Sequence, residues 1–563
     1  MADNNENHTR GYPCKVGSEL IALGDKLFSD KQNFDQLNQE LAYWFAPEKA
    51  DFTNEITLGE EFADHLSDAD TVRVARDLAN LFNTMLRPAD QDWFAVTVPD
   101  EEVKNDTEAR RKLDAMTRIT RAAIYAADAK YTRANSEADI DFAVFGCSVK
   151  SVTNNKDNNG IFFKTWHLKD CAWMENDWGI VDHLHRKMKM TAGGIEKKFG
   201  ERNLPSAVKG ALKRGDRNDK FDVRHVALPV DQYEPVMRKS FPKGTEFASV
   251  YLFEDGTVLK EEPETVFPYI VSRWRTVQGW SYGYSPAAMT ALPDARLIQR
   301  MAVSIIEATE KATEPPLIAT SEAIQGPIDV TAGGVTYVDA QYDERLGAPL
   351  VPLDLGKNPG VGQALMDRKV ADLTSSFYLD KINLPDTRNR TATEVRILQQ
   401  EFIRSTLPIF EPLENEVIAP ELDLVVNRLI KLGAYGTAES FPEILQDMDT
   451  SFEFQNPLRD AREQQVVGKF EESMAIIGAM AQLDPGVVAN VNVDRMFRDT
   501  FKVTANPEWL FTKEEADKIK QDEAQLQQQQ QALQQLQQGA QVASEAVGVA
   551  QQLQQVTGGG GIQ

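Results

Sequence analysis

The residues whose types and spacing best match a metal site are His183 and His185. Two histidines separated by one residue share a face of a β-strand, where both rings could ligate a transition metal. The surrounding segment, about 181–199, is instead predicted to be helical, and it offers no third ligand nearby. Histidines with ordinary surface or hydrogen-bonded roles are the alternative, and we favour it. The sequence therefore predicts no metal ion.

An acidic run, residues 55–70, is the second place where chemistry could occur. "EITLGEEFADHLSDAD" holds six carboxylates and no Lys or Arg, and a carboxylate pair can act as general acid and base. The chain has 86 Asp and Glu residues, however, so neighbouring carboxylates arise by chance and favour a solvated face. The sequence also lacks G-x-x-x-x-G-K-[ST] and G-x-G-x-x-G. We expect no catalytic residue, no cofactor and no enzymatic activity.

A short loop, residues 381–390, is locally basic within this acidic chain. In "KINLPDTRNR", Lys and Arg outnumber the single acid, Asp386. A few such cations give salt-dependent, sequence-independent affinity for phosphates. An ordinary exposed connection is the alternative interpretation of the loop taken in isolation. The candidate residues are Lys381, Asn383, Arg388 and Arg390.

The composition bounds the class of protein. The chain has 563 residues, 42% of them apolar, and a formal net charge of −25. This charge argues against a protein that grips nucleic acid through one large basic face, although it suits a surface past which DNA must slide. No run of 18 uninterrupted apolar residues and no signal peptide is present, so we expect no membrane span. Three widely spaced cysteines suit a reducing cytoplasm.

The first half of the chain is predicted to form an α+β domain. Helices are expected at 18–46, 71–86 and 107–137, with a short strand at "DWFAVTV" between the last two. From 141 to 275 the chain is β-rich, with strands such as "FAVFGCSV" and "FFKTWHL", interrupted by the helix expected near 181–199.

A long helix is predicted to follow, from Ser285 as N-cap to Thr313, ended by Pro315 and Pro316. Its length is about 40 Å at the helical rise per residue. A compact module of about 317–357 separates it from a second helix of about 362–379. Apolar stripes at helical spacing mark the packing faces of the two helices: Ile298, Met301, Ala302, Ile305 and Ile306 on the first, and Met366, Val370, Leu373 and Phe377 on the second.

Further helices are expected downstream of the basic loop. Thr391 and Glu394 form a capping box that opens one, and Gly433 ends another. "SFEFQNPLRDAREQQ" is predicted to begin as a strand and turn into a helix. Residues 521–555 hold 16 glutamines, yet their Leu, Ala and Val residues follow a heptad. A self-associating helix and a solvated Gln-rich tail both remain open for this segment.

Six stretches carry a family resemblance: "GWSYGYSPAAMTALPDARLIQRM", "TATEVRILQQEF", "FEFQNPLRDAREQQ", "LDPGVVANVNVDRMFRDTF" and "FTKEEADKIKQ", together with the N-terminal "LNQELAYWFAPEKADF". These stretches and the order of elements resemble those of bacteriophage portal proteins, the head-to-tail connector family of short-tailed phages. The first five occur in this order between about 278 and 520. None of them is a catalytic motif.

The resemblance implies an α+β, mainly α, portal fold with wing, stem, clip and crown regions, in a ring of about twelve subunits around a channel. The stripes on the two long helices would pack the stem and the subunit interface. Lys381, Asn383, Arg388 and Arg390 would belong to the DNA-channel loop. The implied regions are 1–285 wing, 286–313 first stem helix, 314–357 clip, 358–380 second stem helix, 381–391 channel loop, 392–510 wing and crown helices, and 511–563 a tail that is either a crown barrel or disordered.

The implied function is a portal at one capsid vertex, through which double-stranded DNA is packaged and ejected. The terminase large subunit would dock during packaging and a tail adaptor protein afterwards. Other implied partners are the major capsid, scaffolding and internal core proteins. The protein would assemble in the host cytoplasm and reside in the virion. The alternatives are a scaffold or internal core protein, which the β-rich region opposes, and a hydrolase using carboxylates of residues 55–70.

Overall fold

The structure is a computed structural model of the chain, which divides into two compact units, Met1–Arg459 and Asp460–Gln563. The fold described below is that of the first unit, because the structure describes only isolated positions of the second. The structure describes residues 17–319 with gaps at 58, 90–91, 101–102, 104–105, 202–203 and 238–239, then 324, 327–328, 337, 339, 350–352, 359–382, 413–436, 441–445 and 451–454, and in the second unit 473–474, 476–477, 496, 516 and 518–519.

The N-terminal segment folds into two helices, α1 (Gly17–Asp30) and α2 (Gln32–Phe45), where one helix was predicted. The junction is Lys31, which is buried and donates to the carbonyl of Leu168 at 2.8 Å. This contact joins positions far apart in the sequence, so local periodicity gave no sign of the break. The helix predicted at 71–86 is confirmed as α3 (Asp70–Leu86), with its apolar face buried.

The helix predicted at 107–137 is also two helices, α5 (Thr107–Ile124) and α6 (Tyr131–Phe145). Lys130 adopts a left-handed backbone (φ 56°) at the start of α6, and Gly146 (φ 78°) ends it. Because α6 is buried over most of its surface, its apolar run continues through Phe145. The strand predicted from residue 142 therefore begins only at 147.

Two antiparallel sheets form the β-rich region, which confirms the α+β class. Their strand orders are β3-β2-β9 and β4-β5-β6-β7-β8. The bounds are β2 Cys147–Asn154, β3 Ile161–Trp166, β9 Tyr269–Arg273, β4 Cys171–Glu175, β5 Val181–Thr191, β6 Lys220–Pro229, β7 Phe247–Phe253 and β8 Val258–Glu264.

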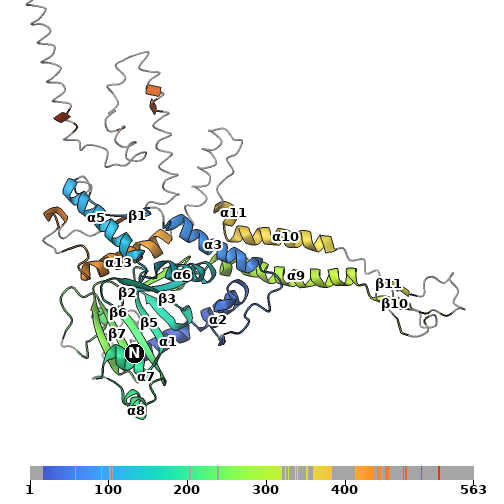
Figure 1. Cartoon of the computed structure of the whole chain (residues 1–563), viewed down its shortest axis with the longest axis horizontal. Coiled ribbons are helices and arrows are strands. Elements are labelled where there is room, and N and C mark those ends of the chain that lie inside the picture. Colours follow the sequence, from blue (N-terminus) through green and yellow to red (C-terminus); the bar gives the residue numbers. More distant parts are fainter. Residues whose placement is uncertain are drawn as a thin grey trace, which may run out of the picture. The chain divides into compact units, whose positions relative to one another are not determined.

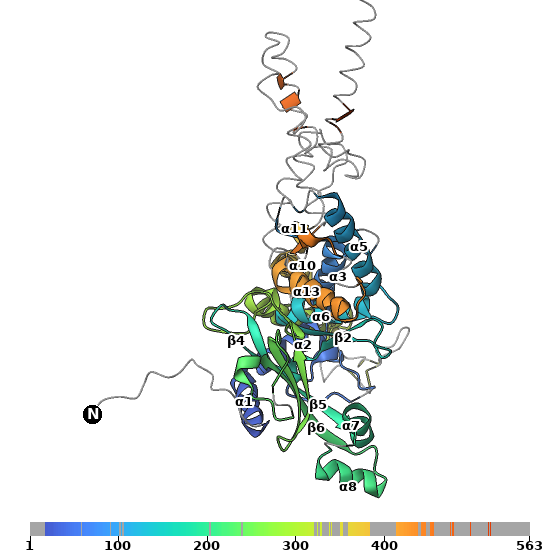
Figure 2. The ribbon, with the colours of Figure 1, turned by 90° about the vertical axis from the view of Figure 1, so that its left-hand side faces the viewer.

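The prediction of a helix over 181–199 was wrong in its first part. This segment begins as β5 and only then turns into α7 (Ala192–Phe199), which is followed by α8 (Ser206–Arg214). Strand β5 lies between β4 and β6, and residues 183–186 are all buried. An interior strand covered on both faces loses the polar–apolar alternation that marks a strand in sequence. Both Figure 1 and Figure 2 show α7 and α8 at the end of this sheet remote from α3 and α5.

The chain then forms the long hairpin described below and returns to the sheets. Helix α13 (Ala419–Lys431) follows a π-helical turn, Glu414–Ile418. Its predicted C-cap is confirmed, because Gly433 has φ 70° and its N–H donates to the carbonyl of Ile430 at 2.9 Å. The predicted strand at 451 is confirmed as β12 (Ser451–Phe454), which pairs antiparallel with β1 (Phe94–Thr97).

A buried ionic network joins three distant parts of the chain. Arg87, at the end of α3, pairs with Asp139 of α6 and donates to Asn135 at 2.7 Å. Lys150 of β2 donates to the same Asn135 oxygen at 2.6 Å and to Glu421 of α13 at 2.6 Å. All five side chains are buried. Two cations face two carboxylates, so the network is electrically balanced.

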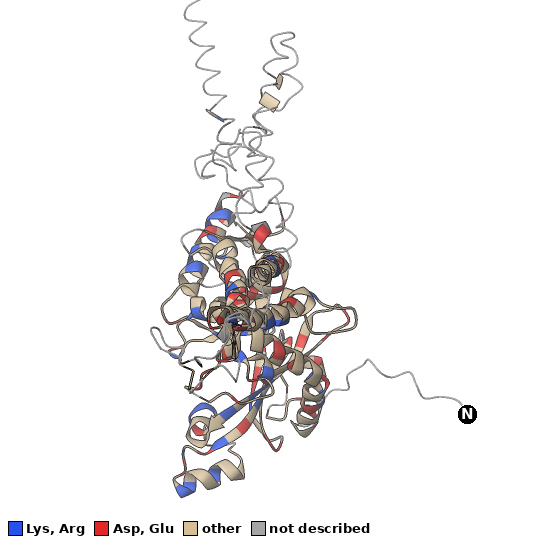
Figure 3. Cartoon of the chain, turned by 90° about the vertical axis from the view of Figure 1, so that its right-hand side faces the viewer, with Lys and Arg blue, Asp and Glu red and all other residues tan. Residues whose placement is uncertain are grey.

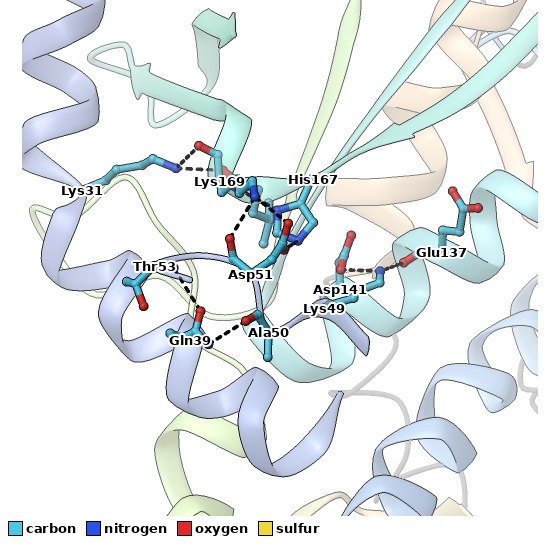
Figure 4. A network of polar contacts seen from close by, with 11 residues as sticks. Lys31, Gln39, Lys49, Ala50, Asp51, Thr53, Glu137, Asp141, His167 and Lys169 are labelled. Carbon is cyan, nitrogen blue, oxygen red and sulfur yellow. Dashed lines mark hydrogen bonds and ion pairs between the residues drawn. The ribbon is translucent and has the colours of Figure 1, made fainter. Parts of the chain in front are cut away.

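A second polar network fixes the turn after α2 (Figure 4). Asp51 accepts from Lys169 at 2.5 Å and pairs with His167 at 2.9 Å, both near the short helical turn between β3 and β4. Lys49 bonds Asp141 of α6 at 2.6 Å. The turn is thereby tied to the sheet on one side and to α6 on the other.

Breaking the first network is expected to be costly. In Glu421→Gln, Lys150 stays buried without its carboxylate, so we expect the free energy of unfolding to fall by about 3 kcal/mol. The measurement is the midpoint of chemical denaturation. Replacing the pair together, as Lys150→Met with Glu421→Leu, should cost less than the single change. Arg133→Gln breaks an exposed pair with Glu137 and should shift stability by less than about 0.5 kcal/mol.

Asp51 gives a pH-dependent prediction. Burial opposes its ionisation, but hydrogen bonds and charges from His167 and Lys169 outweigh this and lower the pKa of Asp51 to about 2. The stabilisation is therefore present above the unfolded pKa of about 4 and is lost as the pH falls toward 2. Asp51→Asn should lower the thermal midpoint at pH 7, with a deficit that narrows between pH 4 and 2. As a control, Asp177→Asn at an exposed position should change neither the thermal midpoint at pH 7 nor its dependence on pH. A deficit for Asp51→Asn that is independent of pH would contradict this account.

Candidate functional site: a two-helix hairpin with a paired tip

The first long helix starts from a cap that is locked into the sheet region. The Ser285 hydroxyl accepts from the N–H of Ala288 at 3.1 Å and donates to the carbonyl of Val144 at 2.5 Å. Gly146 packs directly beneath, where an added Cβ would lie 2.3 Å from the backbone nitrogen of Ser285. The predicted N-cap role of Ser285 is confirmed. The entry of the helix is therefore held against the α6–β2 junction.

A π-helical turn, Ala287–Ala291, precedes the regular helix α9 (Leu292–Thr313). Pro293 lies in the first turn of α9. Because proline has no backbone N–H, an uninterrupted α-helix from residue 286 would lack one backbone hydrogen bond at this position. The wider turn before it places the N–H of Leu292 on the carbonyl of Ala287, which absorbs the irregularity. The 22 residues of α9 span about 33 Å.

Helix α9 and helix α10 (Pro359–Ser376) lie side by side and antiparallel (Figure 1). Near the base, Lys369 pairs with Asp294 at 3.2 Å. Farther out, the bare backbone of Gly362 faces Ile305, whose Cγ1 would lie 3.2 Å from an added Cβ. The strands β10 (Leu317–Ala319) and β11 (Leu350–Pro352) pair antiparallel and close the hairpin at its far end. The predicted strand "GGVTYVDA" lies mostly outside the described residues.

The predicted stripes are buried near the base of the hairpin and exposed toward its tip. Ile298 and Ala302 of α9 are buried, whereas Ile306 is 50% exposed. On α10, Leu373 and Phe377 are fully buried. Of the remaining stripe residues, Met366 is buried, and Met301, Ile305 and Val370 are partly buried.

Sequence periodicity missed a second set of apolar residues on this hairpin. These residues are large, at least 39% exposed, and carried by both helices. They are Leu297, Val303, Val361 and Leu365, and they join Ile306 in what we call the exposed apolar set. Scattered exposed apolar residues are ordinary, but five on one two-helix element leave it short of partners within the described chain.

Aromatic side chains anchor the base of the hairpin. Phe377 packs on Phe45 of α2, with ring centroids 5.5 Å apart. Tyr378, with a left-handed backbone (φ 60°), stacks over Trp274 at 6.5 Å. Trp274 in turn contacts Phe82 at 5.6 Å. These contacts hold the end of α10 against α2 and α3.

The acidic run, residues 55–70, is mostly exposed among its described residues, as a solvated face predicts. Its C-terminal end docks on α9, because the Gln299 side chain accepts from the N–H of Ser67 at 2.8 Å and donates to the carbonyl of Asp68 at 2.7 Å. This docking buries the side-chain amide of Gln299.

The basic loop lies almost entirely outside the described residues. Lys381 falls in the short helix α11 (Leu379–Ile382), and its side chain is not among those described. Asn383, Arg388 and Arg390, and the capping box after them, fall outside the described part of the chain. Their proposed role therefore stays a prediction.

The histidine pair lies on β5 and is buried. His183 and His185 share a hydrogen bond between their Nε2 atoms at 2.9 Å, and burial lowers the pKa of His183 to about 4. In the described part of the chain, no three His, Cys, Asp or Glu residues come together as metal ligands. Burial raises the pKa of the thiols of Cys147 and Cys171 to about 12, which makes them poor nucleophiles. Within the described helices, none is long and apolar enough to cross a membrane.

Comparisons with known proteins identify the family of this chain. The chain is 25% identical over 503 residues to a probable portal protein of Bordetella phage BPP-1, covering 86% of each chain. It is 24% identical over 358 residues to a portal protein of Salmonella phage epsilon15, covering 62% of each chain. The family model for the bacteriophage head to tail connecting protein matches residues 18–510. This chain is therefore a member of the bacteriophage head to tail connecting protein family.

Proposed function

We propose that this protein is a portal, a ring of about twelve copies at one capsid vertex through which double-stranded DNA is packaged and ejected. The observation that carries the proposal is the long hairpin, whose base is anchored and whose outer part presents the exposed apolar set. Repetition of the hairpin around an axis would bury these residues between neighbours. The relatives that are named portal proteins support the same function.

The regions of a portal are assigned to this chain by the same proposal. Helices α9 and α10 form the stem, and the segment between them, closed by β10 and β11, forms the clip. The first 285 residues supply most of the wing. Residues 381–391 form the channel loop, and the chain from 392 to 510 continues through wing and crown. Residues 511–563 form either a crown barrel or a disordered tail.

The proposed mechanism is passive. About twelve copies at −25 each give a ring of roughly −300, which disfavours tight phosphate binding along the path of the DNA. Arg388 and Arg390 add weak, reversible contacts in the channel loop. The clip docks the terminase large subunit during packaging and a tail adaptor protein later. Capsid, scaffolding and internal core proteins are further proposed neighbours in the virion.

The first test is the size and shape of the purified protein. Light scattering with negative-stain electron microscopy should find a ring with a central hole and about twelve subunits of 63.0 kDa. A compact monomer, even in the presence of capsid and scaffolding proteins, would contradict the proposal.

A second test concerns the exposed apolar set. Ile306→Glu places a carboxylate where the proposed interface is apolar, so we expect intact folding and a marked loss of rings in the same micrographs. Ser304→Glu adds the same charge at an exposed position of α9 outside the set and serves as the control. Normal ring formation by Ile306→Glu would remove the set from the interface.

A third test concerns the channel loop. Arg388→Glu combined with Arg390→Glu should leave rings intact but reduce the DNA retained per particle, because attraction to phosphates becomes repulsion. The matched control replaces both residues by Lys, which keeps the charge. The measurement is the DNA content of purified particles. Full packaging and retention by the Glu variant would show that the loop has no such role.

A further inference from the structure

A cavity of about 670 Å³ opens where the two sheets meet, and none of its lining residues belongs to the hairpin. Side chains of β2 and β3 form one wall, and those of β5, β7, β8 and α7 form the others. The volume falls within the range of small-molecule sites, about 300–1,000 Å³. None of the residues discussed for the portal function lies in it.

The lining has the opposite charge to the chain. Both glutamates of the lining are already paired: Glu262 with Lys260 at 2.6 Å, and Glu264 with Arg428 at 2.7 Å. Four more cations remain around the cavity after these pairs are removed: Lys164, Arg186, Lys189 and Lys198. Lys197 and Lys198 occupy the last turn of α7. Figure 3 marks the Lys and Arg positions of the described chain in blue, several of them on the strands and helices at the lower end of the view. The chain has a formal net charge of −25, so a cavity lined mainly by cations needs a physical explanation.

Arg186 is the decisive residue, because it is a buried cation without a carboxylate partner. It is 4% exposed, its Nε donates to the Tyr269 hydroxyl at 2.8 Å, and its guanidinium lies 3.5 Å from the centroid of the Trp166 ring. Among the described residues no carboxylate oxygen comes within 4.0 Å of it. The other buried cations of the described chain each have a carboxylate within about 3 Å: Lys31, Arg87, Lys150, Arg224 and Arg273.

Two lysines stand at the mouth of the same cavity, and in the described chain neither has a carboxylate partner. The Nζ of Lys164 lies 4.1 Å from the centroid of Trp166, and that of Lys198 lies 4.3 Å from the centroid of Tyr251. Burial and the charge of Arg186 lower the pKa of Lys198 to about 8. At neutral pH all three groups carry positive charge and repel one another, a cost that a bound anion would relieve.

A chain of hydrogen bonds adds one neutral donor to the cavity. Tyr269, which accepts from Arg186, is bonded to Nδ1 of His225, and Nε2 of His225 is bonded to the Ser249 hydroxyl at 2.7 Å. Burial lowers the pKa of His225 well below its usual range, so the ring is neutral. With each group donating to the next from Arg186 onward, the Ser249 hydroxyl keeps its hydrogen free to donate to a ligand.

We propose that this cavity binds a compact, phosphate-rich anion of the class of inorganic triphosphate or the phosphate chain of a nucleotide. A planar guanidinium, two ammonium groups and the Ser249 hydroxyl around one cavity match several phosphate oxygens at short range. An acidic peptide fits less well, because an extended chain spreads its charges about 6.6 Å apart on one face. All residues of the site belong to one chain, so binding can be tested independently of ring assembly and of the portal function.

The test is isothermal titration of the full-length protein with inorganic triphosphate at low salt. Lys164→Gln combined with Lys198→Gln should weaken binding at least tenfold, since two charge-assisted contacts are lost. Lys209→Gln combined with Lys213→Gln removes the same charge from exposed positions on α8, outside the cavity, and should change affinity less than about twofold. Arg186→Gln should abolish binding, and the lysine pair carries the test if that variant does not fold.

Three outcomes would overturn the proposal. The first is the absence of triphosphate binding up to about millimolar concentration. The second is an equal loss of affinity in the cavity and control variants, which would show a general charge effect. The third is tighter binding of a hexaglutamate peptide than of triphosphate with the same dependence on Lys164 and Lys198, which would assign the cavity to an acidic protein segment.

Discussion

The buried pairing of Lys150 with Glu421, joined through Asn135 to Arg87 and Asp139, is the constraint on which the rest of the structure depends. Its members come from before and after the long hairpin, so the chain must travel out along α9, return along α10 and still deliver Glu421 to β2. A return displaced by one helical turn would leave buried charges without partners, which costs several kcal/mol for each. Apolar packing alone tolerates such shifts, whereas a balanced ionic network permits a single register. The segments before and after the hairpin are therefore joined by electrostatics, and the base of the hairpin is held by aromatic contacts.

Anchoring at one end explains the gradient of burial along the hairpin. Near the base, α2 and α3 cover both helices, and Leu373 and Phe377 are completely buried. Farther out, α9 and α10 have only each other, and two helices cannot cover a stripe wider than their shared seam. Apolar residues such as Ile306 and Val361 then face solvent in an isolated chain. A rigidly anchored hairpin with exposed apolar residues is well suited to association with copies of itself. Its conformation is preorganised, so association costs little conformational entropy.

Local signals allowed the ends of elements to be predicted where capping chemistry decides them. Ser285 and Gly433 act as the caps that their types and neighbours indicate, and α3 follows its apolar period. The errors have a common physical origin in contacts between distant segments. The break at Lys31 depends on carbonyl groups more than a hundred residues away, and the burial of His183 and His185 depends on the strands on either side. Neither partner is visible in a window of a dozen residues, so periodicity reported a continuous helix at one site and a false helix at the other.

The basic cavity shows the same limit for charge. A net charge of −25 is an average over the whole surface, and it carries no information about which residues the fold gathers together. Arg186 and Lys198 come from β5 and α7, which follow one another in the chain, whereas Lys164 comes from β3. Only the meeting of these elements brings the three side chains to one volume. Residues 381–390 stand out as basic in the sequence because their charges lie close together along the chain. Clusters built by topology do not stand out in this way, and they are recognised instead by comparing each buried cation with its partners. By this comparison Arg186 differs from the other buried cations of the described chain, because its charge is left for something outside the chain to neutralise.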